Sequence, residues 1–272
     1  MDGSSSGSGS GSSSGFSGSS SGFSGSSTGS SSGVSGSSSG GSPNGSIYLE
    51  ECSGALCDGQ SFSVYGSFFT APQGNGGCTV TGSGACAYYS CTGSMQQNGV
   101  SAGTLVVSGP WLMPPVTLAP GANDFYEYTS SSPGFTAGQT ITVTASGAVV
   151  PAFGPDGVVA PQLTQLTSPS ISPDGGTTVI PTGVDLQLTW SGGQAGATML
   201  FQAAGSNGQD YTYCTWNGTD GQGTVPAATL KPFSGTSGYL FYGQYNSTSF
   251  FAGPYAISLT ALPYTGGAVS FQ

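Results

Sequence analysis

From residue 46 onward, the chain consists of short runs rich in Val, Ile, Thr, Tyr and Phe, separated by clusters of Gly, Pro, Asn and Asp. Several runs alternate apolar and polar residues. The apolar members of three of them are Val184, Leu186, Leu188 and Trp190; Ile141, Val143 and Ala145; and Tyr255, Ile257 and Leu259. Because successive strand residues point to opposite faces, this alternation predicts half-buried antiparallel strands with a polar outer face. No window has sustained helical periodicity, so we predict an all-β fold.

Residues 3 to 45 differ from the rest because they are almost entirely Gly and Ser, with an imperfect heptad marked by Phe16 and Phe23. Such a composition cannot bury a core. We therefore predict a disordered, flexible Gly/Ser-rich tether over residues 1–45.

Residues 151–163, PAFGPDGVVAPQL, interrupt the strand pattern with three prolines and two glycines. This break predicts two tandem antiparallel β-sandwich domains, a Cys-containing one over residues 46–160 and a second over residues 161–272. A single continuous two-sheet body is the alternative interpretation.

Charge then narrows the possible partners and chemistry. The 272 residues contain 11 acidic residues, one basic residue (Lys231), no Arg and no His, which gives a formal net charge of −10. Lys and Arg drive nucleic-acid binding, so nucleic acid and anionic membranes are excluded as electrostatic partners. Without His, the chain lacks the commonest general base and any Ser-His-Asp triad.

An enzyme built from this chain would depend on carboxylates, as glycosidases do. The acids considered are Glu50, Glu51, Asp58, Asp124, Glu127, Asp156, Asp174, Asp185, Asp210 and Asp220. Most of them lie in turn sequences, where Asp caps the turn with its own side chain. We predict no catalytic residue, no cofactor and no enzymatic activity, and a carboxylate-based glycosidase is the least favoured interpretation.

The cysteines indicate an oxidising compartment. Five lie within forty residues, Cys52, Cys57, Cys78, Cys86 and Cys91, and Cys214 stands alone. Their spacings lack the paired C-x2-C of structural zinc sites, which favours disulfides. Five cysteines cannot all pair with each other, so either one reaches Cys214 across the domain boundary or at least one stays free. Two local bridges, with Cys214 as a buried thiol, are the slightly preferred interpretation.

Sequence signals for location are indirect. No stretch approaches the roughly 18 apolar residues of a membrane span, and the N-terminus, Met1 Asp2 Gly3, lacks the features of a signal peptide. The predicted disulfides nevertheless favour an extracellular or cell-surface protein. Both observations agree if an export segment was removed, or if the start lies inside a longer gene.

Two further groups of residues are candidate sites. Aromatic runs at Trp111, Tyr88, Tyr89, Phe250 and Phe251 would form a binding platform where they are exposed, and packing in the cores or between domains is the alternative. Oxygen ligands at Asn217, Asp220 and Asp124 are weak calcium candidates, because they do not follow the EF-hand spacing, and ordinary Asx turns are the alternative. We predict no metal site.

The second half resembles a fibronectin type III or immunoglobulin-like sandwich. The segments that carry the resemblance are VDLQLTWSGG, ATMLFQAA, YTYCTW, GTVPAATLKPFSGTSGYLFYGQY and YAISLTAL. Trp190 resembles the tryptophan of the second strand, and Leu230, Pro232 and Tyr239 resemble the turn and tyrosine that enter a late strand.

The whole chain, with its Ser/Gly tether, the segment TASGAVVPAFG and the stretch from TWSGG to TVPAATL, is similar to Ser/Gly-tethered cell-surface lipoproteins of myxobacteria. This resemblance implies tethering to the outer membrane through a lipidated cysteine before the tether, and no cysteine precedes it here. It brings no enzymatic activity. We therefore expect a displayed interaction or adhesion module with a neutral glycan or protein partner. A carbohydrate-binding module that uses exposed aromatics is the alternative.

Overall fold

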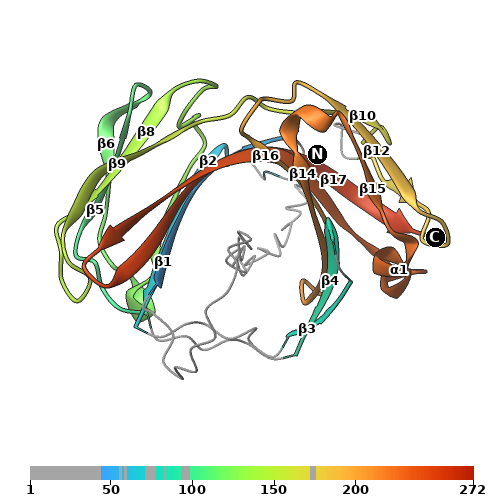
Figure 1. Cartoon of the computed structure of the whole chain (residues 1–272), viewed down its shortest axis with the longest axis horizontal. Helices are drawn as coiled ribbons and strands as arrows, with labels where there is room; N and C mark the ends of the chain where they lie inside the picture. Colours follow the sequence, from blue (N-terminus) through green and yellow to red (C-terminus); the bar gives the residue numbers. More distant parts are fainter. Residues whose placement is uncertain are drawn as a thin grey trace, which may run out of the picture. The chain divides into compact units, whose positions relative to one another are not determined.

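The computed structural model describes residues 44–54, 57, 60–70, 78–82, 84–92, 99–171 and 176–272. Most of them lie in β-strands, which confirms the all-β prediction (Figure 1). The predicted tether, residues 1–45, lies outside the described residues except for Asn44 and Gly45, which begin the first strand.

The largest sheet has ten strands in the order β3-β4-β14-β13-β16-β17-β1-β2-β7, with β11 paired to β17. Their bounds are β1 Asn44–Ser53, β2 Phe62–Phe69, β3 Cys78–Thr81, β4 Cys86–Cys91, β7 Tyr126–Ser130, β11 Thr178–Ile180, β13 Thr198–Gly205, β14 Asp210–Asn217, β16 Ser237–Ala252 and β17 Tyr255–Phe271. The β1–β17 and β11–β17 pairs are parallel, unlike the antiparallel pairing that the alternation predicted.

Two smaller sheets complete the fold. One has the order β6-β5-β8-β9 and the other the order β10-β12-β15. Their bounds are β5 Leu105–Gly109, β6 Leu112–Leu118, β8 Thr140–Ala145, β9 Phe153–Val159, β10 Gln165–Ser168, β12 Leu186–Ser191 and β15 Gln222–Val225. The short helices are η2 Ala122–Asp124, η3 Gly218–Asp220, α1 Ala227–Leu230 and η4 Lys231–Phe233. None of the helices in the described ranges is long and apolar enough to cross a membrane.

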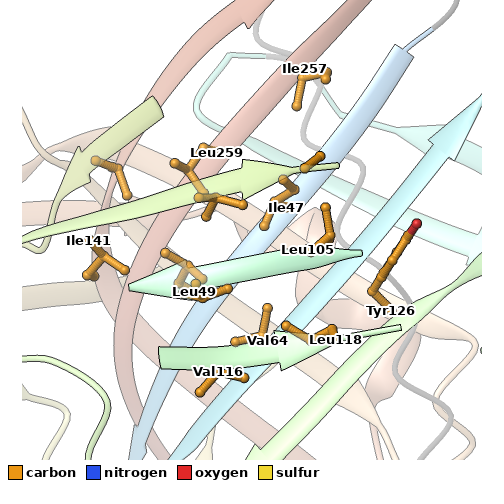
Figure 2. Packing of buried hydrophobic residues seen from close by; sticks show 14 of the residues in the cluster. Ile47, Leu49, Val64, Leu105, Val116, Leu118, Tyr126, Ile141, Ile257 and Leu259 are labelled. Atoms are coloured by element: carbon orange, nitrogen blue, oxygen red, sulfur yellow. The ribbon is translucent and has the colours of Figure 1, made fainter. Parts of the chain in front are cut away.

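The first core lies between the four-stranded sheet and the part of the ten-stranded sheet around β1 (Figure 2). Aliphatic side chains from both layers are removed from water, which is the main force that holds such layers together. They include Ile47, Leu49, Val64, Leu105, Ile141, Ile257 and Leu259. The predicted buried faces of two runs, Ile141 to Ala145 and Tyr255 to Leu259, are confirmed.

The second core lies between the three-stranded sheet and the part of the ten-stranded sheet around β13. Leu186, Leu188 and Trp190 are buried in it, as the alternation predicts. Val184 was expected on the same buried face, but it precedes β12 and is 61% exposed, so that prediction is wrong. In chain order from β10, leaving out β11, the first, second and fifth strands (β10, β12 and β15) form one sheet. The third, fourth, sixth and seventh strands (β13, β14, β16 and β17) form the facing part of the ten-stranded sheet. This is the sandwich arrangement that the resemblance implies.

The long strands β16 and β17, drawn in orange and red in Figure 1, contribute to both cores. Within β17, Ile257 is buried in the first core and Phe271 in the second. All described residues belong to one compact unit. A boundary near residue 160 between separately folding domains therefore stays a prediction, since residues beyond it help to build the first core.

Gln244 of β16 is a buried amide that joins two segments to the sheet, the one after β9 and the loop after β12. Its Nε2 donates to the carbonyl oxygens of Gln162 and Gly192, both at 2.8 Å, and its Oε1 accepts from the backbone N–H of Gln194 at 3.0 Å. The side chain is fully buried, so these bonds replace the water that it would otherwise bind. The segment after β9 is thereby fixed against β16.

Candidate functional site: a tyrosine face on the ten-stranded sheet

The ten-stranded sheet has two unlike faces. Both hydrophobic cores lie on one face, where Ile47 of β1 and Phe201 of β13 point. Residues one position away in each strand point to the other face. Tyr48 lies opposite Tyr65 of β2, and Tyr211 of β14 lies opposite Tyr89 of β4.

Strand register continues this second face across the sheet. Gln202 of β13 lies opposite Tyr213 on one side and opposite Phe241 on the other. We define the tyrosine face as Tyr48, Tyr65, Tyr89, Tyr211, Tyr213, Tyr239, Tyr245, Tyr264, Phe241, Gln202 and Glu50. It therefore carries eight of the 13 tyrosines of the chain.

The aromatic rings of this face contact each other. The rings of Tyr89 and Tyr211 are stacked, with centroids 4.8 Å apart and planes 8° apart. The ring of Phe241 lies 6.4 Å from Tyr239 and 6.1 Å from Tyr264, centroid to centroid. Tyr239 is 36% exposed, and the other tyrosines of the face are half-buried. Flat rings held in this way combine an apolar surface with a polar hydroxyl.

Some hydroxyl groups of the face also interact with each other. Tyr213 donates a hydrogen bond to Tyr245. Tyr48 lies near enough to raise the pKa of Tyr213, although β1 and β14 are separated by three strands. This proximity agrees with the curvature of the sheet in Figure 1. Burial is the largest cause that raises the pKa of Tyr213, so its phenol is neutral at physiological pH.

Glu50 is a buried carboxyl group on the β1 part of the tyrosine face. It lies opposite Ser63 of β2 and beside Leu262 of β17. Burial raises its pKa from the ordinary value of 4.5 to about 7. Its carboxylate in turn contributes to the raised pKa values of Tyr65 and Tyr264, in both cases after desolvation by burial. The carboxyl group is therefore substantially protonated at neutral pH.

The Oε1 atom of Gln202 is buried and has no hydrogen-bond partner in the part of the chain that the structure describes. Among the described residues, Thr164 Oγ1 is the other buried side-chain polar atom without a partner. A buried acceptor without a partner destabilises a protein, because it has lost its bonds to water. This acceptor lies on the tyrosine face, between Tyr213 and Phe241 in the sheet.

Other carboxylates bond to nearby backbone groups. Glu51 accepts from the N–H groups of Gly134 (3.2 Å) and Phe135 (3.1 Å), and Asp185 accepts from that of Ala227 (2.8 Å). Within the described ranges, no three His, Cys, Asp or Glu side chains come together as a metal site would require. Asp58 and Asp174 lie outside those ranges.

The structure does not bring together the aromatic platform predicted from sequence. Tyr88 packs against Phe233 beside the second core, and Phe250 packs against the first core. Trp111, 61% exposed, follows β5, and Phe251, 78% exposed, lies near the end of β16. Tyr89 belongs to the tyrosine face, and Phe251 points to the same side of the ten-stranded sheet from the far end of β16. Adjacent aromatics fail as a signal because neighbours in a strand point to opposite faces.

The weak calcium candidates occupy turns. Asp220 accepts a hydrogen bond from the backbone N–H of Asn217 at 3.2 Å, which is one half of a capping box around η3. Asp124 lies in η2 with φ of 58°, a left-handed conformation that Asp tolerates better than most residues. Asx-type turn chemistry accounts for both positions.

All six cysteines form disulfides, Cys52–Cys57, Cys78–Cys91 and Cys86–Cys214. The preferred interpretation of Cys214 as a free buried thiol is therefore wrong. Register explains the bond, since Cys86 of β4 lies directly opposite Cys214 of β14. The parity of the five clustered cysteines had allowed this bridge, but the pairing of β4 with β14 was not visible in the sequence.

Two details of the immunoglobulin-like resemblance have different outcomes. Trp190 is buried in the second core, where its Nε1 donates to the carbonyl oxygen of Gly218 at 2.8 Å. Tyr239 lies on the tyrosine face, away from that core. A buried tyrosine hydroxyl is found instead at Tyr126, which donates to the Gly103 carbonyl oxygen at 2.7 Å and accepts from the Ala102 N–H at 2.8 Å.

No protein-family model and no curated protein matches the chain. Among solved structures it is similar to the FN1–FN3 domains of chicken CNTN1, with 11% identity, coverage of 84% of this chain and 67% of that chain, and a TM-score of 0.22. A tetra-tandem repeat from the extending region of a large adhesion protein has 12% identity, 84% and 49% coverage, and a TM-score of 0.22.

A third solved structure, from a 1.5-MDa bacterial ice-binding adhesin, has 12% identity, 85% and 65% coverage, and a TM-score of 0.19. The chain spans less than two thirds of the length of this structure and of the tetra-tandem repeat. Likenesses at these TM-scores carry no argument about what this chain does.

Proposed function

We propose that the protein is a non-enzymatic interaction or adhesion module, exported and displayed at the cell surface, that binds its partner through the tyrosine face. The observation that carries this proposal is the placement of eight tyrosines on the sheet face opposite both cores. Tyrosine is enriched at binding surfaces because a rigid ring gives a large contact area at a low entropy cost.

The three disulfides support the exported location. Disulfides persist in oxidising compartments and are rare in the cytosol. Tethering to the outer membrane through a lipid anchor belongs to the same proposal. Because all six cysteines are bonded in pairs, a lipidated cysteine would lie outside the printed sequence.

Binding of the labelled, disulfide-intact full chain to intact producing cells tests the function. We expect saturable binding that a Tyr211→Ala, Tyr239→Ala double variant weakens at least tenfold. Trp111→Ala is the matched control, because Trp111 is 61% exposed and lies between β5 and β6, outside the ten-stranded sheet. Equal binding by the double variant and the parent would contradict the proposal.

Thiol titration of the denatured, cell-derived protein tests the location. We expect no titratable thiol before reduction and six after it, in protein recovered from the cell surface. Six free thiols in freshly isolated protein, or recovery only from the cytosol, would exclude the exported location.

A further inference from the structure

We infer that the ligand of the tyrosine face is a neutral glycan, bound by stacking of its sugar rings on the tyrosines and by hydrogen bonds to the polar groups among them. This inference rests on the proposed function, since it names the class of partner for the same face. Charge, hydrogen bonding and the shortage of accessible aliphatic side chains support it separately.

Charge excludes the anionic glycans. The whole chain has one basic residue, Lys231, and it lies in η4, outside the ten-stranded sheet. A sulfate or carboxylate group would find no cationic partner on the tyrosine face, and the net charge of −10 would repel it. A neutral ligand meets neither obstacle.

Hydrogen bonding favours a ligand rich in hydroxyl groups. The face presents phenols that both donate and accept, together with Ser46, Ser63 and Ser67 of the same strand faces. The unpartnered Oε1 of Gln202 needs a donor, and a sugar hydroxyl supplies one. The buried carboxyl group of Glu50, whose pKa is raised to about 7, adds a group that in its neutral form can donate as well as accept.

The rings themselves fit sugars. The rings of Tyr89 and Tyr211 are nearly parallel and stack on each other, and Tyr239 of the same face is exposed. The C–H faces of a pyranose ring are apolar, so they can cover such rings while the hydroxyl groups at the ring edge bond to phenols.

A protein partner fits this face less well. The central part of a protein interface is more apolar than the rest of the surface. Of the aliphatic side chains on this side of the sheet, Leu200 and Leu262 are buried, with 3% and 5% exposure. The exposed ones, Val80 of β3 and Val179 of β11, are separated by five strands and do not form one apolar centre. The face therefore offers rings and hydroxyl groups, without the aliphatic area of a hydrophobic patch.

The test uses the cell-surface polymer of the producing cells as the probe, immobilised and then treated in one of two ways. Periodate cleaves the vicinal diols of sugars, and protease removes protein. We expect periodate to abolish binding of the full chain and protease to leave it within twofold of the untreated level. After ion exchange of the polymer, we expect binding to the neutral fraction and not to the anionic fraction.

Variants connect this binding to the face. Tyr211→Ala should weaken the apparent Kd for the neutral fraction at least about tenfold, and Tyr211→Phe, which keeps the ring, should weaken it by less. Gln202→Leu should weaken it about threefold to tenfold through the lost hydrogen bond. Trp111→Ala, outside the ten-stranded sheet, should leave the Kd within twofold. Far-UV and near-UV circular dichroism of each variant establishes that it is folded.

The outcomes separate this inference from the proposed function. Binding that protease abolishes and periodate spares, while Tyr211→Ala still weakens it, would overturn the glycan and leave the proposed function standing. Preference for the anionic fraction would also overturn the neutral glycan. Binding that no variant of the tyrosine face weakens would overturn both.

Discussion

The two faces of the ten-stranded sheet are made by the same strands but differ in composition: one packs against both hydrophobic cores, and the other carries the tyrosines. On the core face, the buried amide of Gln244 makes three hydrogen bonds, whereas on the tyrosine face the Oε1 of Gln202 makes none. A face that only stabilises a fold satisfies its buried polar atoms. The unpartnered Oε1 of Gln202 supports the proposed binding role of this face, and Thr164 Oγ1, outside the ten-stranded sheet, is a second buried atom without a partner among the described residues.

The disulfides give the largest expected difference between the faces. Cys86–Cys214, on the core face, closes 128 residues, and Cys52–Cys57, which begins on the tyrosine face, closes five. By loop entropy, replacing the first pair with Ala should lower the free energy of unfolding by about 5 kcal/mol and the second by about 2 kcal/mol. Urea unfolding measures both. Equal losses would contradict the idea that Cys86–Cys214 ties distant segments together.

The two glutamines provide the next comparison. Gln244→Leu leaves two carbonyl oxygens and one N–H without partners and should cost about 4 kcal/mol. Gln202→Leu removes an acceptor that is already unpaired, so we expect a change within about 1 kcal/mol in either direction. Urea unfolding at constant pH is the measurement. A loss with Gln202→Leu as large as with Gln244→Leu would mean that the tyrosine face is a structural interior.

Glu50 makes the stability of the tyrosine face depend on pH. Its pKa is about 7 in the folded protein and 4.5 in ordinary surroundings, so its neutral form favours folding. Its stabilising contribution is complete below pH 4.5 and is lost as pH rises through 7. Above pH 8, Glu50→Gln should be more stable than the parent by on the order of 3 kcal/mol.

Below pH 4.5, Glu50→Gln and the parent should have nearly equal stability. Thermal unfolding at steps between pH 4 and 9 measures the profile. A parent protein that gains stability relative to Glu50→Gln as pH rises would show the opposite sign and refute the buried neutral carboxyl.

The smallest effect compares one hydroxyl from each face. Tyr126→Phe leaves the Ala102 N–H and the Gly103 carbonyl oxygen without their partner, which should cost about 2 kcal/mol. Tyr239→Phe removes an exposed hydroxyl and should change stability by less than about 0.5 kcal/mol. If chemical unfolding gave equal changes for the two variants, the distinction between the faces would fail.

Local patterns in the sequence predicted the strands well. The alternation around Ile141 and around Leu188 gave the buried faces correctly, because one core face imposes a period of two. The exposed Val184 shows where such a pattern continues beyond the strand that it describes.

Pairing between distant strands could not be predicted. The parallel pairing of β1 with β17 joins residues about 210 positions apart, and nothing local in either strand specifies the other. This pairing makes one sheet common to both cores. The bond between Cys86 and Cys214 depends on a similar distant pairing, that of β4 with β14.

The sequence signal for the tyrosine face is a spacing of two between aromatic residues. Aromatics two positions apart, such as Tyr211 and Tyr213 or Tyr239 and Phe241, share a face of a strand. Adjacent pairs such as Phe250 and Phe251 do not. Assembling these short patterns into one face still required the strand order of the sheet.

Hydroxyl-radical footprinting of the disulfide-intact full chain tests the central claim, that one sheet has a core face and an accessible tyrosine face. Labelling of each tyrosine is measured by mass spectrometry under native conditions. We expect Tyr239 to be labelled readily, Tyr89 and Tyr211 to be labelled at intermediate rates, and Tyr126 and Tyr255 to be protected. Protection of Tyr89, Tyr211 and Tyr239 as complete as that of Tyr126 would contradict the claim.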